Sequence, residues 1–234
     1  MQTTLDAYTT PAPEHIKNHP KHWRNRKAGH HWRTHDEEFD ASKLGMWLFL
    51  TTEVLLFAGI FCGYAVFRVL YPEAWANGSH YLDWRFGGAN TIILLLSSWT
   101  VANAVRCAQL NNQKWLKINL IVTLVCAAAF LWIKLQFEYI PKLGDGKAPG
   151  TFFSYPFAQS THEQLWWSLY YMGTGIHALH VVIGGSLLGW VLYRSWRYEA
   201  YGPTEYTMVE NSALYWHLVD LVWIFLFPLL YLIH

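Results

Sequence analysis

LGMWLFLTTEVLLFAGIFCGYAVFRV, residues 44–69, is a long apolar run with a single acid, Glu53, inside it. At about 1.5 Å of rise per residue, a helix of this length crosses a hydrocarbon core of roughly 30 Å, and Glu53 lies near its middle. An acid at that depth costs on the order of 2.5–3.5 kcal/mol, so it faces protein or water rather than lipid tails. Gly59 and Gly63 form a small-xxx-small pair, which lets a neighbouring backbone approach closely. The run therefore predicts a membrane-spanning helix whose acid contacts a neighbouring part of the protein.

The composition of the whole chain also indicates a membrane protein. Hydrophobic residues make up 53% of the chain and charged residues only 14%, far from the average of soluble proteins. The net charge of +1 gives no indication of nucleic-acid binding. Cys62, Cys107 and Cys126 show no C-x-x-C or Cys/His spacing, so neither a disulfide framework nor a zinc site is predicted.

Four more apolar runs follow the first, and together they predict an all-α membrane protein, a bundle of five transmembrane helices. The approximate spans are 44–69, 88–107, 116–135, 165–193 and 213–233. Prolines and glycines break residues 137–163, which we expect to be an extramembranous loop. Lys134 and Glu138, at the end of the third span, are expected at the membrane interface with their charged ends in water.

Residues 1–43 form a polar tail ahead of a transmembrane domain, residues 44–234. The tail contains six histidines: His15, His19, His22, His30, His31 and His35. Three of them would share one face of a helix, as metal ligands could, but a regular ligand order is missing and a solvated docking tail is favoured. The tail opens without an apolar h-region, so we expect no signal peptide. Because it has no apolar stripe to bury, we predict that it orders only against partner subunits.

The distribution of Lys and Arg predicts the orientation. If alternate segments lie on one side of the membrane, the side of the tail holds 12 of these residues and the other side holds 5. Basic residues favour the cytoplasmic side. We therefore expect the N-terminus inside and the C-terminus outside.

Three of the predicted membrane helices carry a set of five ionisable side chains that allows three functional classes. These side chains are Glu53, His177, His180, His217 and Asp220. A di-iron bundle needs repeated Glu-x-x-His, which the spans lack. A haem held between histidines of two helices stays open on spacing alone. The third class is a redox-silent bundle whose polar groups bond one another, anchor lipid head groups or line a proton route.

Three motifs resemble subunit III of haem-copper terminal oxidases. They are GMWLFLTTEVLLFAGIFCGY at 45–64, YYMGTGIHALHVVIGG at 170–185 and ENSALYWHLVDLVWIFLF at 210–227. The family carries a buried glutamate in an SEV or TEV context, then TG-x-H-x-x-H-V, then E-x-x-x-x-YWHFVD-x-VW. The matching residues here are Glu53, Thr174, Gly175, His177, His180, Val181, Glu210, Tyr215, Trp216, His217, Asp220, Val222 and Trp223. Leu218 replaces the usual Phe.

The resemblance implies a non-redox accessory subunit of an aerobic oxidase, an aa3 or caa3 type cytochrome c oxidase. That complex is a proton-translocating oxidoreductase that reduces dioxygen to water. Its subunit III packs on catalytic subunit I, works beside subunit II, carries structural phospholipid and supports proton uptake and stable turnover. Haem and copper are expected in the partner subunits, and no catalytic, cofactor-binding or metal residue in this chain. The candidates for buried polar, lipid or interface roles are Glu53, His177, His180, Glu210, His217, Asp220, Trp216 and Trp223.

The best-known family form has seven helices, with a lipid-holding cleft between the first two and the other five. This chain matches only from the third, like five-helix bacterial forms, so we expect it in a bacterial inner membrane. Lipid or another chain should then cover the open face. The alternatives are an accessory subunit of a quinol oxidase or nitric oxide reductase, or, in a different class, a haem-binding membrane anchor. Contact between the tail and another respiratory complex stays open.

Overall fold

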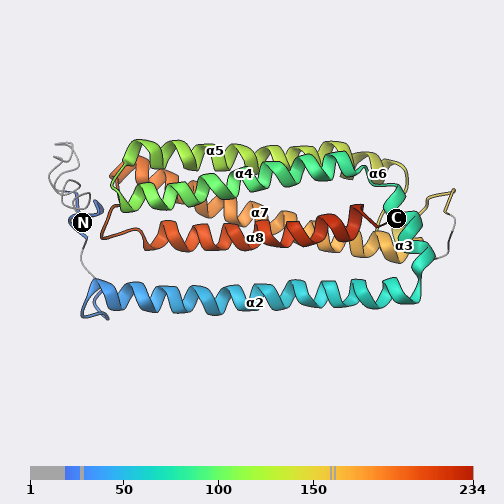
Figure 1. Cartoon of the computed structure of the whole chain (residues 1–234), viewed down its shortest axis with the longest axis horizontal. Coiled ribbons are helices and arrows are strands. Elements are labelled where there is room, and N and C mark those ends of the chain that lie inside the picture. Colours follow the sequence, from blue (N-terminus) through green and yellow to red (C-terminus); the bar gives the residue numbers. More distant parts are fainter. Residues whose placement is uncertain (1–18, 27–28, 159, 161, 234) are drawn as a thin grey trace. The chain divides into compact units, whose positions relative to one another are not determined.

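The described part of the chain folds into five long helices, as the apolar runs predict, with shorter helices between them (Figure 1). The computed structural model describes residues 19–26, 29–158, 160 and 162–233. Each long helix is apolar enough to cross a membrane, and the described residues form no β-strand, only isolated bridges. The elements are α2 (His35–Leu70), α3 (Pro72–His80), α4 (Trp84–Gln109), α5 (Gln113–Ile133), the π-helix η1 (Lys134–Tyr139), α6 (Ile140–Gly144), the 3₁₀ helix η2 (Gly150–Phe152), α7 (Glu163–Tyr198) and α8 (Thr207–Tyr231).

Helix α2 begins at His35, ahead of the apolar run, because the polar residues before the run form a cap. The Glu37 amide donates to the Thr34 hydroxyl (3.2 Å), and the Arg33 amide donates to the Glu37 carboxylate (3.0 Å). This is close to the Ser/Thr-x-x-Glu capping box, and Asp36, Glu37 and Glu38 in the first turn complement the helix dipole. The expected tail boundary at residue 43 therefore lies inside a continuous helix.

The third long helix corrects two expectations. Helical structure continues past Phe137, where a loop is expected, through the π-turn and α6 to Gly144. The π-turn lies just before Pro141, whose missing N–H cannot continue an α-helical ladder. Lys134 and Glu138 in this turn are each only 2% exposed, so the expectation of charged ends in water is wrong.

The chain divides into two compact units, each built from parts of all five long helices. The first contains the described part of Met1–Leu50 with Leu96–Val125 and Ile183–His217. The second contains Thr51–Leu95, Cys126–Val182 and Leu218–His234.

A glycine sets the helix contact in the first unit. A Cβ on Gly184 of α7 would lie 2.9 Å from the Trp216 ring of α8, closer than real Cβ contacts. Trp216 is fully buried there, and its indole N–H donates to Ser97 of α4 (3.0 Å). By contrast, apart from the adjoining backbone of α2 itself, no described atom lies within 4 Å of a Cβ placed on Gly59 or Gly63 of α2. The small-xxx-small pair therefore makes no close contact with the described part of this chain.

Candidate functional site

Glu53 of α2 and His180 of α7 form a half-buried pair in the second unit. The Glu53 Oε2 and His180 Nε2 atoms are 2.7 Å apart, and the two side chains are 16% and 9% exposed. The His180 Nδ1 lies 2.7 Å from the carbonyl of Ile176, which can only accept, so Nδ1 carries a hydrogen. The Glu53–His180 contact then holds one proton, on the carboxyl or on Nε2. Apolar helices thus place a protonatable pair where Glu53 is predicted to need a partner.

His177, one turn from His180 on α7, lies in an aromatic enclosure instead. It is fully buried, with the rings of Phe130 and Trp223 centred 5.5 and 5.2 Å from its own. Neither ring nitrogen has a hydrogen-bond partner among the described residues. The two histidines of the motif are therefore in different environments, although their spacing puts them on one helix face.

The remaining sequence candidates cluster on α8. His217 Nδ1 lies 2.7 Å from the Ser98 hydroxyl, and the Trp223 indole donates to Thr91 (3.1 Å), so both bond α4. Asp220 is 3% exposed. Near the start of the helix, Glu210 forms an ion pair with Lys43 of α2 (2.8 Å). Each contact ties α8 to a neighbouring helix within one unit.

These contacts bear on the open alternative of a haem anchor. Both ring nitrogens of His180 already have partners, and Nδ1 of His217 is taken by Ser98. The described residues also bring no three His, Cys, Asp or Glu side chains together as a metal-binding group. The geometry favours hydrogen bonding over ligation at these positions.

A buried charged cluster in the second unit escapes the sequence analysis. Lys134 Nζ lies 2.5 Å from Glu138 Oε2 and 2.5 Å from the Tyr231 hydroxyl. The hydroxyls of Tyr170 and Tyr231 donate to the same carboxylate oxygen, at 2.6 and 2.5 Å. Lys142 lies 3.8 Å from it. The i,i+4 spacing of Lys134 and Glu138 is the one sequence signal that could have revealed the pair, whereas the tyrosines come from α7 and α8.

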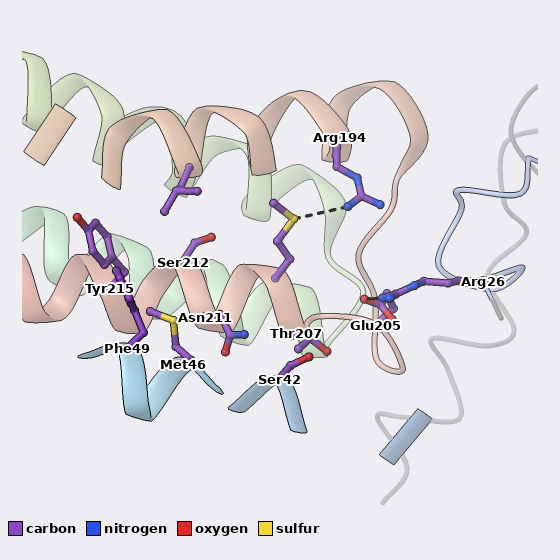
Figure 2. Close-up of a pocket in the computed structure, with 12 residues that line it drawn as sticks. Arg26, Ser42, Met46, Phe49, Arg194, Glu205, Thr207, Asn211, Ser212 and Tyr215 are labelled. Atoms are coloured by element: carbon purple, nitrogen blue, oxygen red, sulfur yellow. Dashed lines mark hydrogen bonds and ion pairs between the residues drawn. The ribbon is translucent and has the colours of Figure 1, made fainter. Parts of the chain in front are cut away.

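The first unit contains a cavity of about 380 Å³ lined by α2, α7, α8, the loop before α8 and the tail residue Arg26. Figure 2 shows Arg26, Arg194 and Glu205 toward one end, with Phe49 and Tyr215 toward the other. Met46 and Leu187 add to the apolar wall. The full lining is Arg26, Ser42, Met46, Phe49, Leu187, Arg194, Glu205, Thr207, Met208, Asn211, Ser212 and Tyr215. The cavity is thus amphipathic, with its cations gathered at one end.

Of the two arginines that line this cavity, Arg194 contacts a sulfur atom and an aromatic ring rather than a carboxylate. Its guanidinium donates to the Met208 sulfur (3.5 Å), the dashed contact at Arg194 in Figure 2. It also lies 5.6 Å from the centre of the Tyr201 ring. Within the described part of the chain, no carboxylate lies within 4.0 Å of Arg194. A guanidinium that contacts a sulfur and a tyrosine side chain but no carboxylate can still bind an anion through its bidentate fork.

Comparison with known proteins assigns the chain to a family. The family model described as "Cytochrome c oxidase subunit III" matches residues 24–234. Cytochrome c oxidase subunit 3 of Synechocystis sp. is 32% identical over 242 residues, covering 100% of this chain and 88% of the relative. Quinol oxidase subunit 3 of Bacillus spizizenii is 30% identical over 194 residues, covering 81% of this chain and 85% of the relative. Heme-copper oxidase subunit I+III of Aeropyrum pernix is 30% identical over 201 residues, covering 83% of this chain and 23% of that longer protein.

Proposed function

Since the chain belongs to the cytochrome c oxidase subunit III family, we propose that it is the accessory subunit III of a haem-copper oxidase. The observation that carries the proposal is the family match over nearly the whole chain. The half-buried Glu53–His180 pair agrees with it, because its groups bond each other and leave no open ligand position. In this role the chain holds no electron-transfer group. Haem and copper belong to partner subunits, and the bundle supports proton uptake and stable turnover there.

The proposed location is a bacterial inner membrane, with the N-terminus inside and the C-terminus outside. The excess of Lys and Arg on the side of the tail supports this orientation. On this assignment the Arg26 and Arg194 end of the cavity lies on the cytoplasmic side, and the loop that contains η2 lies on the outer side.

The proposed partners are catalytic subunit I and subunit II. The fused Aeropyrum relative supports the first, because its printed name joins subunits I and III in one protein. The exposed face of α2 supports it too, because Gly59 and Gly63 there allow another backbone to approach closely.

The proposed ligand of the first-unit cavity is a phospholipid. Its phosphate would meet Arg194, and its acyl chains would lie on Phe49, Leu187 and Tyr215. Charge-assisted bonds from an arginine fork suit a phosphate, and the apolar wall suits hydrocarbon. By the resemblance, the five long helices described here correspond to the last five of the seven-helix form, so lipid or another chain is also expected to cover the open face.

Purification of the complex through a tag on this chain tests the assignment. We expect haem-bearing subunit I to co-purify, and native mass spectrometry to find phospholipid or a covering chain bound to subunit III. The chain expressed alone should show no haem absorption in the visible range, which separates this function from a haem anchor. A copper-binding subunit II would indicate cytochrome c as the donor, and its absence would favour quinol, as in the Bacillus relative's name. A tagged chain that carries haem by itself, or never associates with an oxidase, would contradict the proposal.

A further inference from the structure

A short stretch of the tail, His19–Arg26, packs against the rest of the first unit, in contrast to the expectation that the tail orders only against partner subunits. Trp23 is 3% exposed and lies against Gly202, in the loop between α7 and α8. The contact is so close that a Cβ on Gly202 would lie 2.4 Å from the Trp23 ring. His19 stacks on Tyr198 with 4.7 Å between ring centres. The seat is therefore an aromatic anchor in a notch that only glycine leaves open.

Arg26 joins this stretch to the mouth of the amphipathic cavity. Its guanidinium forms ion pairs with Glu38 of α2 (2.7 Å) and with Glu205. Arg26 and Glu205 both line the cavity, at the end where Arg194 also lies (Figure 2). The position of Arg26 thus depends on the Trp23 anchor on one side and on two carboxylates on the other.

We propose that His19–Arg26 is a lid over the charged end of the cavity, anchored by Trp23 at Gly202 and latched by Arg26 on Glu38 and Glu205. The inference rests on the proposed phospholipid site. A phosphate bound to Arg194 would compete with the Glu205 carboxylate for the guanidinium of Arg26. With the lid seated, Arg26 completes the charged end of the site; with the lid lifted, that end opens. The lid therefore controls the rate at which a lipid enters and leaves the cavity, whereas the other lining residues of the cavity stay the same.

His22 gives the lid a response to acid. It is 1% exposed on the inner side of the stretch, and burial lowers its pKa below the usual 6.5. The Glu199 carboxylate at the end of α7 opposes this by raising the pKa, while Arg24 and His19 of the lid lower it further. The Glu199 carboxylate is also shared with Lys117 of α5, at 3.6 Å. The seated lid thus favours neutral His22.

Substitution of Gly202 by valine tests the seat without altering a cavity residue. Gly202 has no left-handed backbone angle, so the valine itself is not strained, but its side chain occupies the place of the Trp23 ring. In the full-length chain in phosphatidylcholine nanodiscs, we expect hydrogen-exchange protection of a peptide covering 19–26 to fall at least about tenfold. Trp23→Ala should give the same loss, and Gly189→Ala, where a Cβ meets nothing, should give none. Unchanged protection in both Gly202→Val and Trp23→Ala, with α7 and α8 peptides intact, would refute the lid.

Lipid exchange then separates the lid from the site that it covers. The probe is deuterated phosphatidylglycerol in phosphatidylcholine nanodiscs, and native mass spectrometry follows its replacement of bound lipid. We expect about tenfold faster exchange in Gly202→Val, and less retained lipid in Arg194→Gln. If Arg194→Gln retains lipid normally, the lipid assignment of the cavity fails, whatever the lid does. If Arg194→Gln loses lipid but Gly202→Val exchanges it at the parent rate, the lid is overturned and the lipid site stands.

Acidification should lift the lid. Because the seated lid holds His22 with a lowered pKa, its stability is fully present above about pH 6.5 and falls as the pH drops below that value. Protection factors of the 19–26 peptide, corrected for intrinsic exchange, should therefore decrease between about pH 7.5 and about pH 5.5. His22→Gln keeps an acceptor for the Arg24 amide but cannot titrate, so the dependence should disappear. His80→Gln, at an exposed histidine of α3 outside the stretch, is the matched control, and it should keep the dependence. A slope that survives His22→Gln would exclude His22 as the sensor.

Discussion

Lys134→Met is expected to lower the free energy of unfolding of the chain by about 3–5 kcal/mol, because it leaves a buried carboxylate without its charge partner. Glu138 is 2% exposed and would keep only the two tyrosine hydroxyls and Lys142 at 3.8 Å. The loss should be seen in thermal unfolding of the purified complex and in the yield of chain that assembles.

Removal of both charges should recover part of this loss. In Lys134→Met with Glu138→Gln, the amide oxygen still accepts from Tyr170 and Tyr231, and the buried charge left in the cluster is Lys142, 3.8 Å from the replaced carboxylate. Replacing a buried ion pair by neutral groups is often close to neutral, whereas removal of one member is not. Lys114→Met, an exposed position of helix α5, which η1 follows directly, should change stability little and serves as the control. A double variant as unstable as Lys134→Met would show that the unpaired Glu138 is not the cause. The loss would then come from the ammonium's contacts with the Trp223, Tyr170 and Tyr231 rings, at 4.9, 5.0 and 5.1 Å, or from Lys142 without its carboxylate.

Glu53→Ala is expected to weaken association with the partner subunits or to shorten the working life of the oxidase, and Glu53→Gln to do neither. The alanine leaves His180 Nε2 half-buried without its 2.7 Å partner, which costs about 1–3 kcal/mol. The glutamine amide can donate to Nε2 while Nδ1 still donates to Ile176, so it preserves the pair without a titratable carboxyl.

Oxygen consumption, proton release and turnover number before inactivation, measured on the purified complex, distinguish the two variants. Equal initial rates with a shorter life for the alanine variant would support a structural role for the Glu53–His180 pair. A fully assembled Glu53→Gln complex without oxygen reduction or proton pumping would contradict that role and would place Glu53 on a proton path.

The sequence was sufficient for the family and for the fold class. Hydropathy along the chain predicts five membrane helices, and the structure confirms them with boundaries that differ at their polar ends. The motifs around Glu53, around His177 and His180, and at 210–223 indicate the family that the comparison confirms. These signals are local, because insertion into a bilayer depends on the apolar content of one segment at a time. The roles of the individual site residues and the tail boundary at residue 43 stay predictions.

The partners of the buried groups could not be predicted in the same way. Helix spacing puts His177 and His180 on one face, yet one bonds Glu53 and the other lies between aromatic rings. Lys134 looks like an interfacial lysine in the sequence, and only the approach of Tyr170 and Tyr231 from two other helices makes it a buried one. The packing of the tail could not be predicted either. Trp23 lies in a notch at Gly202 that no sequence spacing indicates, whereas His15, one of the three histidines that would share a helix face, lies outside the described residues.

By itself, then, the sequence determined which segments cross the membrane, that Glu53 would need a polar partner there, and which family the chain belongs to. Only the tertiary structure decided that this partner is His180, that Lys134 and Glu138 are buried, and that Arg26 lines the same cavity as Arg194. The physical reason is that apolar content and helical period are properties of neighbouring residues. The choice of a polar partner depends instead on how each helix is rotated and shifted against others, and side-chain packing sets that only when the helices meet.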